Sequence, residues 1–310
     1  MCYPPVTITS EGHLFEKHPS LLVLMAASIW ATSGLFIRYA DLPPASMAFF
    51  RMAVPTLLIG VSYLLRRHPV ATASIKIRLV ASGINAVRML LYLVAFANTT
   101  IANAVVMLYT WPVFASLFGV VVLRERVDGV QKLLLLIAFS GIPLLYLGNE
   151  LSFADRDVVG MTAMLGSAIL HALTLILLKR ATPGNDRFES TFFQNLIGSV
   201  LFIPALWLPG TLSASNAEIL TAVGYGAIIG IGGFTLFFVA LHRLPAAVAS
   251  NLTYFEVVMG IFLGWLVLGE PVTWNTLVGG ALIAISIIAA QLRTYRRERA
   301  SLVAPSSGSR

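Results

Sequence analysis

The feature that most constrains this chain is a series of apolar segments, each about as long as a helix that crosses a membrane. A spanning helix needs about 20 mostly apolar residues, and the 310-residue chain supplies such runs repeatedly between short polar connections. Charged residues make up 11% of the sequence, well below the roughly 25% of an ordinary soluble domain. The pattern predicts an all-α integral membrane protein.

Ten segments are expected to form transmembrane helices. No basic region followed by a short apolar stretch and a cleavage site precedes the first of them, so we expect no removable signal peptide. Residues 1–19 are interpreted as a cytoplasmic N-terminal segment and residues 293–310 as a basic, disordered cytoplasmic tail. The expected helices cover residues 20–38, 45–65, 79–97, 101–123, 130–147, 158–178, 188–208, 217–241, 246–268 and 274–292.

The positive charges predict the orientation of these helices. With the N-terminus in the cytoplasm, 17 of the 21 Lys and Arg residues fall in cytoplasmic segments, as the positive-inside rule requires. We therefore expect a multi-pass protein of the plasma (inner) membrane with both termini in the cytoplasm. The net charge of +7 does not indicate a nucleic-acid partner, because that needs Lys and Arg gathered on one solvated face.

The two halves of the chain share a weak internal similarity. Aligning Glu125, at the end of the fourth expected helix, with Glu270, at the end of the ninth, also brings Tyr109 onto Tyr254. "FFR" early in the second expected helix matches "FFQ" early in the seventh. The similarity keeps the same order in both halves and predicts an internal repeat.

The repeat is expected to be inverted. Residues 20–148 and 158–292 each hold five expected helices, and an odd number turns the second half upside down relative to the first. Glu125, expected inside, has arginine on both sides, whereas Glu270, expected outside, lies between Gly269 and Pro271. Two inverted five-helix repeats are a recurring architecture of secondary transporters.

Several short motifs carry a resemblance to a known family. The chain resembles the drug/metabolite transporter superfamily and its EamA-type branch in its ten segments, its repeat and three motifs. The motifs are "AASIWATSGLFIR" in the first helix, "FFR" in the second and "LRERV" at the end of the fourth. The resemblance implies a central cavity walled mainly by helices 1 to 4 and 6 to 9, with helices 5 and 10 peripheral. It also implies a transporter, commonly an exporter of amino acids and related metabolites. Other members move sugars, nucleotide sugars, phosphorylated compounds or cofactors.

Two charges are expected near the middle of the membrane. Glu256 lies about 15 Å into the ninth helix and Arg88 lies similarly deep in the third, where each charge costs about 2.5 to 3.5 kcal/mol. Three interpretations of Glu256 remain open. It is a structural acid, neutral or paired with Arg88; it binds the amino group of a substrate whose carboxylate binds Arg88; or it carries a proton, since burial favours the neutral carboxyl.

Other polar and aromatic side chains lie at compatible depths. Asn85, Arg88 and Tyr92 follow at spacings of three and four and share one helix face. His171 is a candidate for proton handling, with a satisfied internal histidine as the alternative. Arg51 is expected to reach the outer surface or to form a structural pair, in preference to contact with a substrate. The candidate substrate-binding residues are Trp30, Asn85, Arg88, Tyr92, Tyr109, Trp111 and Glu256.

An enzyme is the rival class of function. The chain has no H-E-x-x-H, P-loop or G-x-S-x-G motif, and Asp155 and Asp157 are interpreted as the acids of a solvated turn. A single cysteine, Cys2, excludes a multi-cysteine metal site. We therefore predict no catalytic residues, no metal and no cofactor.

The prediction is a secondary transporter that works by alternating access and exports amino acids or similar small polar metabolites. Coupling to protons is left open. An importer or exchanger of an organic anion, sugar or cofactor is the alternative, and an integral membrane enzyme is the weaker one. Expected partners are a small-molecule substrate and the lipid bilayer, no nucleic acid is expected, and a homodimer is left open.

Overall fold

The protein is all-helical in every part that the structure describes. The computed structural model describes residues 19–66, 75–123, 129–145, 147, 155–181, 187–241 and 252–303, and these contain no β-strand. The predicted all-α class is confirmed. The expectations for residues 1–18 and 304–310, and for Arg124 and Glu125, lie outside the described residues.

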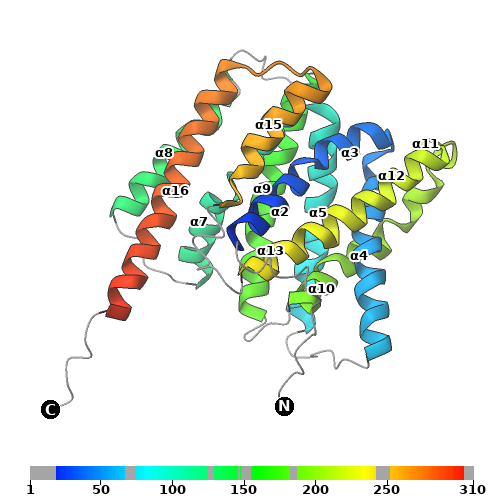
Figure 1. Ribbon diagram of the computed structural model, residues 1–310, viewed down its shortest axis with the longest axis horizontal. Helices are drawn as coiled ribbons and strands as arrows, with labels where there is room; N and C mark the ends of the chain where they lie inside the picture. Colours follow the sequence, from blue (N-terminus) through cyan, green and yellow to red (C-terminus); the bar gives the residue numbers. More distant parts are fainter. Residues whose placement is uncertain are drawn as a thin grey trace.

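The helices follow one another with short connections (Figure 1). In chain order they are α2 (Pro19–Ala31), α3 (Ser33–Ala40), α4 (Pro44–Arg66), α5 (Ile75–Asn98), α6 (Ile101–Leu108), α7 (Trp111–Leu123), α8 (Gly129–Leu145), α9 (Arg156–Ala181), α10 (Arg187–Leu201), the 3₁₀ turn η1 (Ile203–Trp207), α11 (Pro209–Leu212), α12 (Asn216–Ala227), the π-helix η2 (Ile228–Gly233), α13 (Phe234–Leu241), α15 (Phe255–Leu268) and α16 (Trp274–Val303).

The last helix is longer than the sequence predicts. Helix α16 continues from Trp274 to Val303, so the first part of the expected disordered tail is helical. The residues concerned, "RTYRRERASLV", contain no glycine or proline, and Arg, Glu, Ala and Leu all have good helix propensity.

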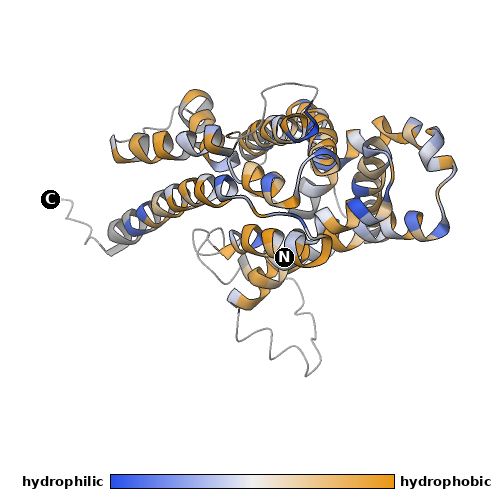
Figure 2. Ribbon diagram, turned by 90° about the horizontal axis from the view of Figure 1, so that it is seen from above, coloured by the Kyte–Doolittle hydropathy of each residue, from blue (hydrophilic) through white to orange (hydrophobic). Residues whose placement is uncertain are grey.

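Five helical stretches are long and apolar enough to cross a membrane. They are Pro19–Ala40, Pro44–Leu65, Ile75–Asn98, Arg156–Leu177 and Asn216–Phe237. Large apolar side chains such as Leu64, Leu65 and Ile285 are exposed on the outer faces, and apolar residues prevail along the helices in Figure 2. An exposed apolar surface of this kind fits lipid and does not fit water. The protein is therefore a multi-pass membrane protein.

The packing of the helices follows a regular scheme. Helix α5 packs against α9 and α10, while α12, with η2 and α13, packs against α2, α3 and α4. Helices α6 and α7 pack against α9, and α15 packs against α2. Three further pairs are α4 with α10, α6 with α15, and α8 with α16. The pair α8 and α16 lies at one edge of the molecule (Figure 1), as the family resemblance implies for helices 5 and 10.

Three helical stretches are interrupted, and two of the interruptions have a local cause. Thr32 separates α2 from α3, where the hydroxyls of Thr32 and Ser33 donate to the carbonyls of Ile29 and Trp30 at 2.6 Å, and such bonds bend helices. Tyr109 and Thr110 separate α6 from α7, directly before a proline that cannot continue the backbone ladder. A third interruption, at residues 253–254, precedes α15.

Candidate functional site

Glu256 lies beside an interruption in its own helical stretch. The sequence predicts a continuous helix over 246–268, but residues 253 and 254 form a turn and α15 begins at Phe255. Glu256 therefore occupies the first turn of α15, where the helix N-terminus favours negative charge. The side chain is 7% exposed, so Glu256 is the buried acid that the sequence predicts.

Tyr109 joins Glu256 from the other half of the chain. Its hydroxyl oxygen lies 2.7 Å from the carbonyl oxygen of Thr253 and 2.7 Å from Oε2 of Glu256. The rings of Tyr109 and Tyr254 are 5.0 Å apart. Two interrupted helical stretches thus face each other across the contact of α6 with α15, and the tyrosines that the sequence alignment pairs lie side by side.

The hydrogen bonds at Tyr109 depend on the protonation of Glu256. A phenol has one hydrogen to donate, while Tyr109 has two acceptors at the same distance. With an ionised Glu256, Tyr109 donates to only one of them. With a protonated Glu256, the carboxyl donates to Tyr109 and Tyr109 donates to Thr253, so that both contacts are hydrogen bonds.

Arg88 does not form an ion pair with Glu256 in the structure. The Nε of Arg88 donates to Oδ1 of Asn85 at 2.7 Å, and its guanidinium carbon lies 6.0 Å from the centroid of the Tyr92 ring. These three residues share one face of α5, as their spacing predicts. Tyr92 is close enough to interact electrostatically with Glu256 and lies between the arginine and the acid in this interaction network.

Arg51 is buried rather than extended to a surface. Only 7% of it is exposed, and its guanidinium carbon lies 5.8 Å from the centroid of the Tyr225 ring. Arg51 and Arg88 interact electrostatically with each other and both act on Tyr225. The expectation that Arg51 reaches the outer surface is therefore wrong. Distance along the helix axis gives a residue's depth, but the direction of the side chain depends on the neighbouring helices.

The π-helix η2 borders this group of residues. A side chain at Gly230 would lie 2.9 Å from Nη1 of Arg51, and one at Gly233 would collide with Nε1 of Trp30. The glycines therefore let both side chains lie against the η2 backbone. Trp30 also packs on Phe234 and Phe237, with centroid distances of 5.1 and 5.5 Å. Single-turn π-helices occur frequently at functional sites.

Trp111 and His171 form a separate pair. Their rings meet edge to face at 5.2 Å, at the contact of α7 with α9. The Nδ1 of His171 is buried and has no hydrogen-bond partner in the described residues, and His171 interacts electrostatically with Arg88. Its role in proton handling, like the substrate contacts of Trp30 and Trp111, stays a prediction.

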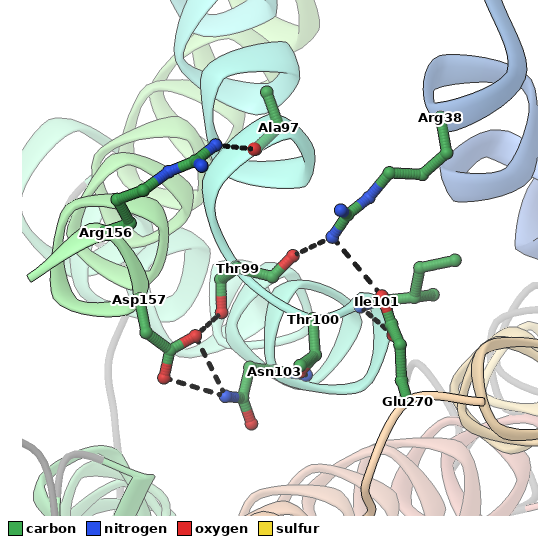
Figure 3. A network of polar contacts seen from close by, with 9 residues as sticks. All are labelled: Arg38, Ala97, Thr99, Thr100, Ile101, Asn103, Arg156, Asp157 and Glu270. Carbon is green, nitrogen blue, oxygen red and sulfur yellow. Dashed lines mark hydrogen bonds and ion pairs between the residues drawn. The ribbon is translucent and has the colours of Figure 1, made fainter. Parts of the chain in front are cut away.

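A second polar network connects several helix ends (Figure 3). Glu270 follows Gly269, whose left-handed conformation (φ 64°) ends α15. Its Oε2 accepts a hydrogen bond from the backbone N–H of Ile101 at 2.7 Å, and its Oε1 forms an ion pair with Arg38 at 3.3 Å. Arg38 also donates to the carbonyl of Thr99 at 2.8 Å. Glu270 thus ties α3 and the start of α6 to the end of α15.

Asp157 extends the network to α9. It accepts hydrogen bonds from the hydroxyl of Thr99 and from Nδ2 of Asn103, and Asn103 Oδ1 accepts from Thr276 at 2.6 Å. Asp157 is therefore a bonded structural residue, and the prediction of a solvated turn is wrong for it. Spacing alone gave no sign of this bonding, because the partners lie far away in the chain.

The environment of Glu270 perturbs its titration. Partial burial raises the pKa of Glu270, and the charge of Asp157 raises it further, while the Ile101 N–H and Arg38 act in the opposite direction. Burial is the largest of these effects, since removal from water disfavours the charged form.

The comparisons with known proteins concern the chain as a whole. Residues 19–147 and 158–290 each match the EamA-like transporter family. The "Pseudopaline exporter CntI" of Pseudomonas aeruginosa is 26% identical over 88% of this chain and 95% of the relative. "Solute carrier family 35 member G1" of Mus musculus is 22% identical over 88% and 77% of the two chains. A solved crystal structure covers 91% of this chain and 99% of its own, with a TM-score of 0.61 and 19% identity, which shows a shared fold.

Proposed function

Because the chain belongs to the EamA-like transporter family, we propose that it is a secondary transporter that exports a small, carboxylate-bearing metabolite by alternating access. In this proposal the chain crosses the inner membrane ten times, as two inverted five-helix halves, with both termini in the cytoplasm. Family and relatives indicate transport rather than catalysis. The name of the Pseudomonas relative as an exporter supports the direction.

The packing scheme supports the inverted halves. Helices 1 to 5 correspond to α2 with α3, α4, α5, α6 with α7, and α8, and helices 6 to 10 correspond to α9, α10, α12 with α13, α15, and α16. If the first five are exchanged in order for the last five, the contact of α5 with α9 becomes that of α12 to α13 with α2. The contact of α5 with α10 becomes that of α12 with α4, and the contact of α6 and α7 with α9 becomes that of α15 with α2. The pairs α4 with α10, α6 with α15, and α8 with α16 map onto themselves. This pattern is the one expected of an internal two-fold relation between the halves.

The observation that carries the proposal is the contact of Tyr109 with Glu256 and Thr253. It joins the two halves where a helical stretch of each is interrupted, and interrupted helices at the interface of inverted repeats hold the substrate and coupling ions of many transporters. The single hydrogen of Tyr109 makes the contact sensitive to the charge of Glu256. We therefore assign Glu256 the role of the proton carrier and Arg88 that of binding the carboxylate of the cargo.

The first experiment identifies the cargo. The purified chain is heated with amino acids, nucleosides, sugars, vitamins and organic anions, and ligands that raise the unfolding midpoint are reconstituted into proteoliposomes for transport. We expect carboxylate-bearing compounds to stabilise the protein and an imposed proton gradient to drive their movement. Stabilisation by uncharged compounds alone would contradict the role of Arg88.

The decisive variant is Glu256→Gln. Glutamine reproduces the hydrogen bonds of the protonated acid, because its amide donates to Tyr109 while Tyr109 donates to Thr253. The variant should fold and exchange labelled for unlabelled cargo across the membrane, but a proton gradient should no longer drive net transport. Glu218→Gln, which changes a half-buried acid in the capping box of α12, is the matched control, because glutamine also suits this capping position. Full proton-driven transport in Glu256→Gln would remove Glu256 from the coupling mechanism.

A further inference from the structure

Two buried arginines lie in the same part of the molecule without an acidic partner. Arg51 on α4 and Arg88 on α5 are 7% and 9% exposed, and in the described residues neither forms an ion pair. Glu256, the only carboxylate away from the ends of the expected spans, is held by Tyr109. Each buried charge costs about 2.5 to 3.5 kcal/mol in a membrane, and the two like charges also repel each other.

The surroundings of the arginines add hydrogen-bond donors. The Nε1 of Trp30 is buried and has no hydrogen-bond partner within the described helices, and the buried hydroxyl of Tyr225 lies close to Arg51 and Tyr92. Arg51 and Trp30 both lie against the η2 backbone, at Gly230 and Gly233, and Arg51 also faces the ring of Tyr225. An indole has only a donor to offer, and a guanidinium has five N–H donors and no acceptor. Among the described residues the group therefore has more donors than acceptors and carries no negative charge.

We propose that Arg51 and Arg88 together bind a cargo that carries at least two acidic groups. One carboxylate binds the Nη donors that Arg88 keeps free while its Nε bonds to Asn85. The second acidic group binds Arg51, with Trp30 and Tyr225 as further donors. Charge-assisted bonds from arginine to carboxylates are short and strong, and two of them neutralise both buried cations. The inference rests on the proposed transport function and adds Arg51 to the site.

The test uses three compounds of one length that differ only in charge. Succinate has two carboxylates, succinamate has one, and succinamide has none. Binding to the purified full-length protein is measured by calorimetry at fixed pH and ionic strength, with glutarate and adipate to vary the spacing of the two acids. We expect the dicarboxylates to bind at least about tenfold more tightly than succinamate, because each charged hydrogen bond lost changes affinity by about this factor or more. Succinamide should bind most weakly.

The variants separate the roles of the two arginines. In Arg51→Gln the preference for succinate over succinamate should disappear while succinamate still binds, and Arg88→Gln should weaken both. Arg51→Lys keeps the charge and should keep part of the preference, so it replaces Arg51→Gln if that variant fails to fold. The exposed Arg296 provides the control Arg296→Gln, which should bind like the parent protein.

The inference is overturned if succinamide binds as well as succinate, or if Arg51→Gln keeps the full preference. It is also overturned if no dicarboxylate binds while alanine binds the parent protein and not Arg88→Gln. That result leaves the proposed transport of carboxylate-bearing metabolites intact. Failure of every compound in this series and in the wider panel counts against both proposals.

Discussion

Tyr109 connects the two halves of the molecule through one hydroxyl group. Replacing it by phenylalanine removes the partner of the buried Glu256 carboxyl, while the Thr253 carbonyl keeps its hydrogen bond from the Glu256 N–H. An unpaired buried polar group costs about 1 to 3 kcal/mol, so Tyr109→Phe should lower the free energy of unfolding by this amount in detergent. Tyr39→Phe, at an exposed tyrosine, is the control, and equal stability of the two variants would show that the contact is unimportant.

Glu270 should give the folded protein a pH-dependent contribution to stability. Its pKa is raised by burial in the folded state, so the folded state binds the proton more tightly than the unfolded chain does. The resulting stabilisation is complete below the ordinary pKa of a glutamate and is lost as the pH rises through the raised value. Unfolding midpoints measured at several pH values between 4 and 8 test this.

The comparison variant for that test is Glu270→Gln, which keeps an oxygen for the N–H of Ile101 and does not titrate. The midpoint of the parent protein relative to this variant should be higher at acid pH than at pH 8. A difference that does not change with pH would mean that the ion pair with Arg38 offsets the burial of Glu270.

The sequence predicts the burial of these side chains better than it predicts their neighbours. The rise per residue of a helix places Arg88 and Glu256 deep inside, and both are buried. The same reasoning misses that Arg51 packs on Tyr225, because the direction of a side chain around the helix depends on the helices beside it. Tyr225 itself gives no signal in the sequence, since a tyrosine in an apolar run also suits packing or the membrane interface.

At the scale of elements, η2 provides the sharpest test. Gly233→Ala places a methyl group against the indole of Trp30, and overpacking of this kind costs about 1 to 3 kcal/mol. The variant should unfold at lower temperature and bind cargo more weakly, because Trp30 must move. Gly83→Ala, in α5 with nothing within 4 Å of the added carbon, should leave binding unchanged and raise the unfolding temperature slightly, because alanine has the higher helix propensity. Normal binding by Gly233→Ala would separate Trp30 from the site.

Helices are easier to predict here than their interruptions. Apolar length is a local property, so most of the helices lie on stretches where the sequence predicts helix; the short α11 and the end of α16 do not. The break before Trp111 follows from Pro112, which the sequence shows directly. The turn at residues 253–254 has no proline or glycine, and it coincides with the contact that Tyr109 makes from the other half. The contacts of Arg51 and Trp30 with Gly230 and Gly233 of the π-helix likewise form only in the folded chain.

At the scale of the whole molecule, the orientation in the membrane is directly testable. In a Cys2→Ser background, single cysteines are introduced at Ser213 and at Lys76, both exposed in the structure. A membrane-impermeant maleimide added to intact cells should label Ser213→Cys, which is expected outside. It should label Lys76→Cys only after the cells are permeabilised. The reverse pattern would overturn the predicted orientation.

The exchange of equivalent contacts between the halves has an energetic consequence. With the halves inverted as proposed, a conformation open to one side of the membrane has a counterpart open to the other side, built from corresponding contacts. Two such states have similar free energies, so both are populated and a modest difference in ligand affinity shifts the balance between them. The fold then supplies a reversible path, and the concentrations of cargo and protons on the two sides decide which way the cargo moves.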